Sequence, residues 1–175
     1  MINIVIDVGA SEGNYALELR DTGYCDKIIS FEPQSESFRI LQERALGDPK
    51  WTCINAALGM VEDEAALYIS GHKTSSSFLP ITETHLCAMP SSAIIGKEKV
   101  KVLTLDSLVG TAIKPSDRIY LKIDVQGYEM AVLKGSIQTL TQTRAVEIEL
   151  SLTPLYEGTP LMTEMISYLE SLGFV

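Results

Sequence analysis

The stretch INIVIDVGASEG, residues 2–13, decides the fold class. Residues 2–8 are rich in β-branched side chains, which favour a buried β-strand. A glycine-containing turn follows, and residues 13–21 have the pattern of a helix that begins near Ser11 or Glu12. Glycines at a strand-to-helix turn let the backbone approach a ligand closely. The stretch therefore predicts the first strand and helix of an α/β fold, joined by a ligand-binding turn.

Short apolar runs alternate with helical patterns along the rest of the chain, which predicts a mostly parallel, doubly wound sheet with crossover helices. Further strands are expected at residues 27–31, 51–56, 119–124 and 145–150. Helices are expected at residues 34–46, 128–134, 136–142 and along the apolar stripe from Leu161 to Leu172. Residues 65–69 suit a short extra strand, and residues 100–105 alternate like an edge strand.

Residues 71–98 have no sustained period and are rich in serine, glycine and proline. A loop of this length in a compact domain is usually a lid, a binding loop or a mobile segment. With 175 residues in total, the chain is expected to form a single domain over residues 1–175 that carries the long loop 71–98. We expect that loop to be mobile and to border the substrate pocket.

Composition limits the classes of partner. The chain has 14 Lys and Arg residues against 23 Asp and Glu residues, a net charge of −9, which argues against a nucleic-acid partner because such binding needs a basic surface. No apolar run approaches the ~18 residues of a membrane helix, so no membrane partner is expected. Cys25, Cys53 and Cys87 fit neither a disulfide framework nor a CxxC metal site. The composition favours a reduced, cytoplasmic protein.

Glu32 is the first candidate for binding a cofactor. It lies 19 residues after Gly13, at the carboxyl end of the second expected strand, where a carboxylate can accept hydrogen bonds from both hydroxyls of a ribose. Asp7 can accept a hydrogen bond from a ligand ammonium group or order the turn. The alternative is that the glycines only make a tight turn and that Glu32 caps the helix after Pro33.

The turn also indicates which nucleotide is bound. Ser11 stands where a dinucleotide-binding fingerprint has its middle glycine, and Glu12 would place a negative charge beside a pyrophosphate. An acidic turn suits S-adenosylmethionine, which carries a sulfonium and an ammonium group and no phosphate. A nucleotide-dependent oxidoreductase is the alternative, and Ser11 and Glu12 count against it.

Asp124 is the leading catalytic candidate. It ends the strand beside the switch point of the sheet, where open α/β sheets bind ligands. There its carboxylate can position the methionine ammonium group or an acceptor hydroxyl, or act as a base if burial raises its pKa. The alternative role is that of a helix N-cap before residues 127–134. Lys122 shares the face of Asp124 and is either a paired core lysine or an acceptor contact.

Further candidates lie on the last expected strand and in the long loop. Glu147 and Glu149 share one strand face, which is costly unless one is exposed, protonated or partnered; Glu149, nearer the strand end, is therefore a candidate catalytic residue. His72 in the long loop is a candidate general base near neutral pH, although a surface histidine is the alternative. A divalent metal shared by Asp124 and Glu149 is conceivable, but no metal is predicted.

Six motifs, in order, resemble those of the FkbM family of methyltransferases. They are Asp7-Val8-Gly9-Ala10, Phe31-Glu32-Pro33, Asn55-Ala56-Ala57-Leu58-Gly59, Thr104-Leu105-Asp106-Ser107-Leu108, Leu121-Lys122-Ile123-Asp124-Val125-Gln126-Gly127-Tyr128-Glu129 and Glu147-Ile148-Glu149. The resemblance implies the methyltransferase version of the Rossmann fold, S-adenosylmethionine as cofactor and, usually, methylation of a hydroxyl oxygen. Known acceptors of the family include macrolide-like natural products and sugars.

The resemblance also implies which residues bind the cofactor. They are Asp7, Gly9 and Gly13 around the methionine part, Glu32 at the ribose, and Asn55 with Ala56 near the adenine. Ala10 and Pro33, beside these residues in the chain, are also expected to bind the cofactor. For Asn55 the alternative is a turn residue that hydrogen-bonds the nearby backbone.

Two departures from the family pattern stand out. Many members have Glu where this chain has Gln126. The chain also ends where a sixth strand would start, so the C-terminal strand pair is expected to be missing, and the exposed edge beside the fifth strand predicts association with a second copy. We expect a methyltransferase that modifies a hydroxyl of a small molecule or sugar. The remaining alternative is a truncated, non-catalytic cofactor-binding domain.

Overall fold

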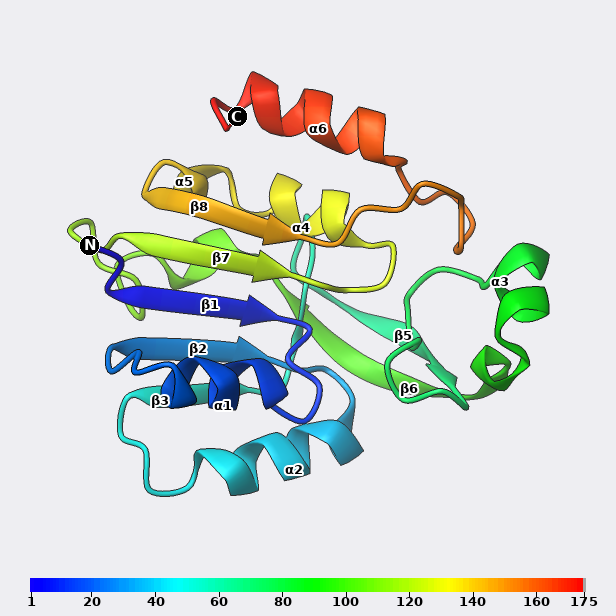
Figure 1. The fold of residues 1–175 in the computed structure, drawn as a ribbon, viewed down its shortest axis with the longest axis horizontal. Helices are drawn as coiled ribbons and strands as arrows, with labels where there is room; N and C mark the ends of the chain where they lie inside the picture. Colours follow the sequence, from blue (N-terminus) through cyan, green and yellow to red (C-terminus); the bar gives the residue numbers. More distant parts are fainter. Residues whose placement is uncertain (175) are drawn as a thin grey trace.

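The computed structural model describes residues 1–174 and is built on a five-stranded parallel sheet (Figure 1). The strand order is β3-β2-β1-β7-β8, which confirms the predicted mostly parallel, doubly wound sheet. The bounds are β1 (Ile4–Val8), β2 (Lys27–Phe31), β3 (Trp51–Ile54), β7 (Ile119–Ile123) and β8 (Thr143–Ile148). The order reverses at β1, which lies between β2 and β7. The crevice at the carboxyl ends of β1 and β7 is therefore the expected ligand site.

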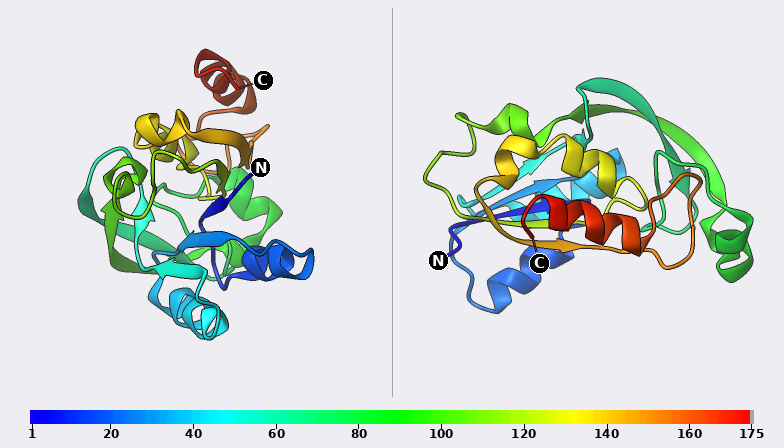
Figure 2. Two further views of the ribbon diagram at one scale, coloured as in Figure 1. Left: turned by 90° about the vertical axis from the view of Figure 1, so that its left-hand side faces the viewer. Right: turned by 90° about the horizontal axis from the view of Figure 1, so that it is seen from above.

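Helices cover both faces of the sheet, as the right-hand view of Figure 2 shows for α1 and the α4–α5 pair. The helices that flank the sheet are α1 (Asn14–Asp21), α2 (Ser35–Ala45), α4 (Glu129–Lys134), α5 (Ile137–Leu140) and α6 (Met162–Ser171). Ala16 of α1 and Leu41 of α2 pack against Val5 of β1. On the opposite face Ile6 packs in one cluster with Val132 of α4. Because both faces are covered, every residue of β1 is buried.

A second, three-stranded sheet departs from the expectation. It has the order β4-β6-β5, with β4 (Ala57–Leu58), β5 (Asp63–Ser70) and β6 (Ile94–Leu103). β5 and β6 pair as an antiparallel hairpin, and β6 pairs with β4 on its other side. The strand predicted as an edge at residues 100–105 is thus the central strand of this sheet, because two strands that are remote in sequence pair with it.

The segment 71–98, predicted as one long loop, is partly regular. It contains α3 (Glu83–Ala88), the 3₁₀ turn η1 (Pro90–Ser92) and residues 94–98 of β6. The helix is too short to show a period, and residues 94–98 are held by pairing with β5. Thr82 caps α3 by accepting a hydrogen bond from the backbone N–H of His85 (3.3 Å). A further 3₁₀ turn, η2 (Leu105–Leu108), leads from β6 toward β7.

The edge of the large sheet at β8 has no partner strand within residues 1–174. α6 runs beside β8 (Figure 1), and Met165 of α6 packs into the main hydrophobic cluster.

Within residues 1–174, no helix combines the length and the apolar character needed to cross a membrane.

Candidate active site

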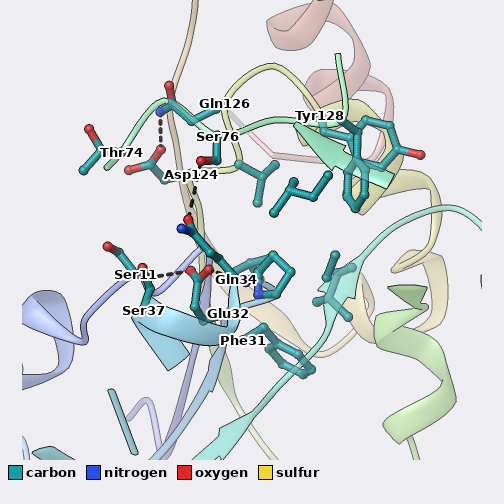
Figure 3. A pocket seen from close by; sticks show the side chains of 18 of the residues that line it. Ser11, Phe31, Glu32, Gln34, Ser37, Thr74, Ser76, Asp124, Gln126 and Tyr128 are labelled. Carbon is teal, nitrogen blue, oxygen red and sulfur yellow. Dashed lines mark hydrogen bonds between the residues drawn. The ribbon is translucent and has the colours of Figure 1, made fainter. Parts of the chain in front are cut away.

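A pocket opens at the carboxyl ends of β1, β2 and β7, where the sheet topology places a ligand (Figure 3). Together with its open mouth it holds about 730 Å³ of space not filled by atoms. Of the predicted site residues, the pocket wall includes Gly9, Glu32, Pro33, Ala56 and Asp124.

The turn after β1 forms one wall of the pocket. Gly9 has φ +79°, and a Cβ at this position would lie 1.9 Å from the backbone oxygen of Asp124. Ser11 also has a positive φ of 49°, which is uncommon for a residue with a side chain. The backbone N–H groups of Gly9 and Ala10 both donate to the carbonyl oxygen of Phe31. The turn is therefore fixed by backbone contacts to β2 and β7.

Glu32 lies on the pocket wall with only 7% of its surface exposed. Its two carboxylate oxygens accept hydrogen bonds from the backbone N–H groups of Ser11 and Gln34, each at 2.8 Å. Burial raises the pKa of Glu32 to about 7, although these two donors act in the opposite direction. A carboxylate has about four acceptor positions, so lone pairs remain for hydroxyl groups of a ligand.

Asp7 lies beneath the pocket and is fully buried. It pairs in register with Lys122 of β7, whose Nζ is 3.1 Å from Asp7 Oδ1. This contact is an ion pair without hydrogen-bond geometry, so neither oxygen of Asp7 has an aligned donor. Burial raises the pKa of Asp7, and the charge of Lys122 opposes that shift. Lys122 is thus a paired core lysine, and Asp7 is not part of the pocket wall.

Asp124 follows β7 directly and lines the pocket with 42% of its side chain exposed. Its Oδ2 lies 3.7 Å from Lys122 Nζ, and its Oδ1 accepts a hydrogen bond from Gln126 Nε2 at 2.9 Å. It does not cap the next helix, because α4 begins at Glu129 with Tyr128 at the N-cap position. The carboxylate of Asp124 is therefore available to the pocket.

Glu129 shapes the turn between Asp124 and α4. It is buried, and its Oε1 accepts hydrogen bonds from the backbone N–H groups of Val125 (3.1 Å) and Gly127 (3.0 Å). Within this turn Gln126 has φ +56° and Gly127 has φ +95°. The role of Glu129 is structural: it holds two successive residues in the left-handed region.

Four predicted cofactor contacts lie behind or below the pocket wall. Asp7 and Ala10 are buried, and Gly13 is the N-cap of α1, where a Cβ would lie 2.7 Å from Leu41 Cδ1. Asn55 donates from Nδ2 to the backbone oxygens of Glu32 (2.9 Å) and Pro33 (3.1 Å). Asn55 thereby fixes the loop that carries Glu32.

Two catalytic candidates also lie outside the pocket wall. His72 Nδ1 is 3.2 Å from the hydroxyls of both Ser75 and Thr74. Glu149, after β8, accepts a hydrogen bond from Gln126 Nε2 at 2.8 Å. His72 is thus engaged within its own loop, whereas Glu149 is joined to Asp124 through one side chain.

Residues 72–78, which we call the strap, close one side of the pocket and were not identified residue by residue from the sequence. Lys73 Nζ lies 2.9 Å from Glu12 Oε1, and Ser76 Oγ donates to Gln34 Oε1 at 3.4 Å (Figure 3). Phe78 packs against Tyr128, with ring centroids 5.0 Å apart. In the sequence, only the serine content and the absence of a regular period indicate that this segment is a loop beside the pocket.

The negative charge of Glu12 is paired with cations from the strap and from α2. Its carboxylate pairs with Lys73 and, at 3.5 Å, with Arg44, and the hydrogen bond from Lys73 lowers the pKa of Glu12. The negative charge that the sequence placed beside a pyrophosphate is therefore already paired.

Among residues 1–174 no three His, Cys, Asp or Glu side chains are arranged to hold a metal ion.

Comparison with known proteins agrees with this geometry. A family model described as the methyltransferase FkbM domain matches residues 7–175, nearly the whole chain. No curated protein matches the chain. The parallel sheet, the glycine turn after β1 and the acidic residues after β2 and β7 all lie within the matched region, and the chain therefore belongs to the FkbM family of methyltransferases.

Proposed function

We propose that this chain is an S-adenosylmethionine-dependent methyltransferase that methylates a hydroxyl oxygen of a small molecule or sugar. The observation that carries the proposal is the buried carboxylate of Glu32 on the pocket wall, with Asp124 on the opposite side (Figure 3). A carboxylate after β2 suits the two hydroxyls of a ribose, and methyl transfer is the activity of the family.

The residues of the pocket fit this cofactor in charge and in shape. Glu32 would hold the ribose, and Asp124 is the pocket carboxylate that can face the ammonium and sulfonium charges. Phe78 and Tyr128 belong to an apolar wall on which an adenine can stack. Lys73, a cation on the pocket wall, is paired with Glu12, so no unpaired lysine or arginine lines the pocket to bind a phosphate. When bound, S-adenosylmethionine supplies an electrophilic methyl group.

The residues of the chain position the reactants and provide a proton acceptor. Asp124, exposed to the pocket, can accept the hydrogen of an acceptor hydroxyl. The contact of Gly9 with Asp124 keeps the turn after β1 and the end of β7 at a fixed separation, and such fixed placement of reactants contributes much of the rate of a bimolecular transfer. The strap limits access of water from one side. Thr74 and Ser76 add polar groups that suit a hydroxylated acceptor.

Calorimetry tests the proposal. We expect S-adenosylmethionine and S-adenosylhomocysteine to bind the chain and NADH not to bind. Glu32→Ala should weaken S-adenosylhomocysteine binding by about 1.5–3 kcal/mol, the range for a lost hydrogen bond to a charged group. Glu36→Ala, which removes an exposed carboxylate from the first turn of α2, is the matched control and should bind like the wild type. Tighter binding of NADH than of S-adenosylmethionine would favour an oxidoreductase instead.

A further inference from the structure

The side chain of Gln126 lies between two carboxylates. Its Nε2 donates to Asp124 Oδ1 at 2.9 Å and to Glu149 Oε2 at 2.8 Å. An amide nitrogen carries two hydrogens, so one hydrogen is available for each carboxylate. Through this single amide, the end of β8 is joined to the residue that faces the pocket after β7.

The orientation of the Gln126 amide is fixed by its other contacts. Its Oε1 accepts a hydrogen bond from the hydroxyl of Tyr156 at 2.9 Å, and Tyr156 is buried. Its backbone oxygen accepts a hydrogen bond from Ser77 Oγ at 2.7 Å. A flipped amide would turn its oxygen toward both carboxylates and its nitrogen toward a hydroxyl. The strap, the Tyr156 loop and the strained backbone of Gln126 (φ +56°) together hold the NH₂ group toward Asp124 and Glu149.

The charged groups around the two carboxylates do not neutralise them. Lys122 is the cation beside Asp124, at 3.7 Å, and it is closer to the buried Asp7 at 3.1 Å. Glu129 of α4 faces the turn and adds negative charge, while Tyr156 is a neutral donor. Burial, and after it the nearby charge of Asp124, raise the pKa of Glu149 to about 7.

We propose that Gln126 is a positioning residue that holds Asp124 on the pocket wall and joins it to Glu149, which lies outside the wall. This inference rests on the proposed function. In the transfer, a bond forms between the acceptor oxygen and the methyl carbon, and the carbon–sulfur bond breaks with its electron pair left on sulfur. The O–H bond of the acceptor breaks, and its proton passes to Asp124. Asp124 is the catalytic residue, while Glu149 and Gln126 act through it.

The side chain of Gln126 donates hydrogen bonds to Asp124 and Glu149 without adding a charge. A glutamate here would place a third carboxylate against Asp124 and Glu149 and would remove both N–H donors. A leucine would remove the donors without adding charge. Both changes disfavour the ionised form of Glu149 beside Asp124, so both should raise the pKa of Glu149.

Carbon-13 NMR of the side-chain carboxyl groups, recorded as a pH titration without cofactor, tests the proposal. Asp124→Asn and Glu149→Gln assign the two signals. In the wild type we expect the Glu149 signal to report a protonation step near neutral pH. In Gln126→Leu that step should move up by about one pH unit, and in Gln126→Glu by at least as much. Gln42→Leu, an exposed position on α2, should titrate like the wild type.

An unchanged Glu149 step in both folded Gln126 variants would overturn the proposal. Gln126→Glu keeps the shape of the side chain and its bond with Tyr156, so it remains informative if Gln126→Leu does not fold. Because the titration uses no cofactor, its result is separate from the calorimetric test of the proposed function. For any alcohol that the wild type methylates, the pH of half-maximal kcat should shift upward in the Gln126 variants together with the NMR step.

Discussion

Gly9 and Asp124 are in backbone contact across the pocket floor, so close that a Cβ on Gly9 would lie 1.9 Å from the carbonyl oxygen of Asp124. The contact joins the turn after β1 to the end of β7, the two strands between which the sheet order reverses. It therefore sets the separation between the proposed cofactor turn and the proposed catalytic carboxylate.

Gly9→Ala should destabilise the protein and disrupt the site. Alanine is strained at φ +79°, and its methyl group has no room against a backbone atom that cannot rotate away. We expect a loss of at least about 2 kcal/mol in the free energy of unfolding, measured by urea denaturation. Gly23→Ala is the control, since Gly23 has a similar φ of 93° but open space around it. Equal losses in both variants would show that only backbone strain matters at Gly9.

Asp124→Asn should separate cofactor binding from catalysis. The amide keeps an oxygen for Gln126 Nε2 but cannot accept a proton as the carboxylate does. We expect S-adenosylmethionine affinity within about tenfold of the wild type and methyl transfer lowered by at least about 10²-fold. Release of S-adenosylhomocysteine with a panel of alcohols and sugars measures the transfer, and Asp21→Asn, at an exposed position on α1, is the control. Transfer at nearly the wild-type rate would remove Asp124 from the mechanism.

The raised pKa of Glu32 predicts how stability depends on pH. The pKa is about 7 in the folded protein against 4.5 for an ordinary glutamate, so the folded state holds this proton to higher pH than the unfolded state. The contribution is fully present below pH 4.5 and is lost as the pH rises through 7, which amounts to about 3 kcal/mol. Urea unfolding between pH 4.5 and 8 should therefore show a steeper decline for the wild type and Glu36→Ala than for Glu32→Ala. Parallel curves for all three proteins would contradict the shifted pKa.

Hydrogen exchange should divide the segment 71–98 into two parts. Residues 94–98 pair with β5 and should exchange slowly, whereas Lys73 and Thr74 belong to the strap and should exchange quickly in the free protein. S-adenosylhomocysteine should slow exchange in the strap and leave residues 94–98 unchanged. Strong protection of the strap in the free protein would mean that it is a rigid wall rather than a segment that orders around a ligand.

The sequence predicted the large sheet because its signals are local. Strands such as Ile4–Val8 and Ile119–Ile123 are short, mostly apolar runs with one charged residue each, and Glu32 and Asp124 follow their strands directly. The hairpin of β5 and β6 was only partly recognised, since Leu67 pairs with Glu98 across a long separation in the chain. No local pattern encodes such a pairing.

The site was predicted less completely than the fold, for a related reason. Glu12 looks like a free charge in the sequence, but Lys73 reaches it from a segment remote in sequence. Asn55 follows its strand as a ligand contact would, yet its amide turns back to the backbone of Glu32 and Pro33. Side-chain direction and long-range partners decide which residues face a pocket, and neither can be obtained from spacing alone.

A crystal structure of the chain with S-adenosylhomocysteine tests the central claim most directly. The proposed function predicts the ligand in the pocket at the carboxyl ends of β1, β2 and β7, with its ribose hydroxyls hydrogen-bonded to the carboxylate of Glu32 and its sulfur on the side of Asp124. A ligand bound elsewhere, or bound in this pocket with no contact between the ribose and Glu32, would contradict it.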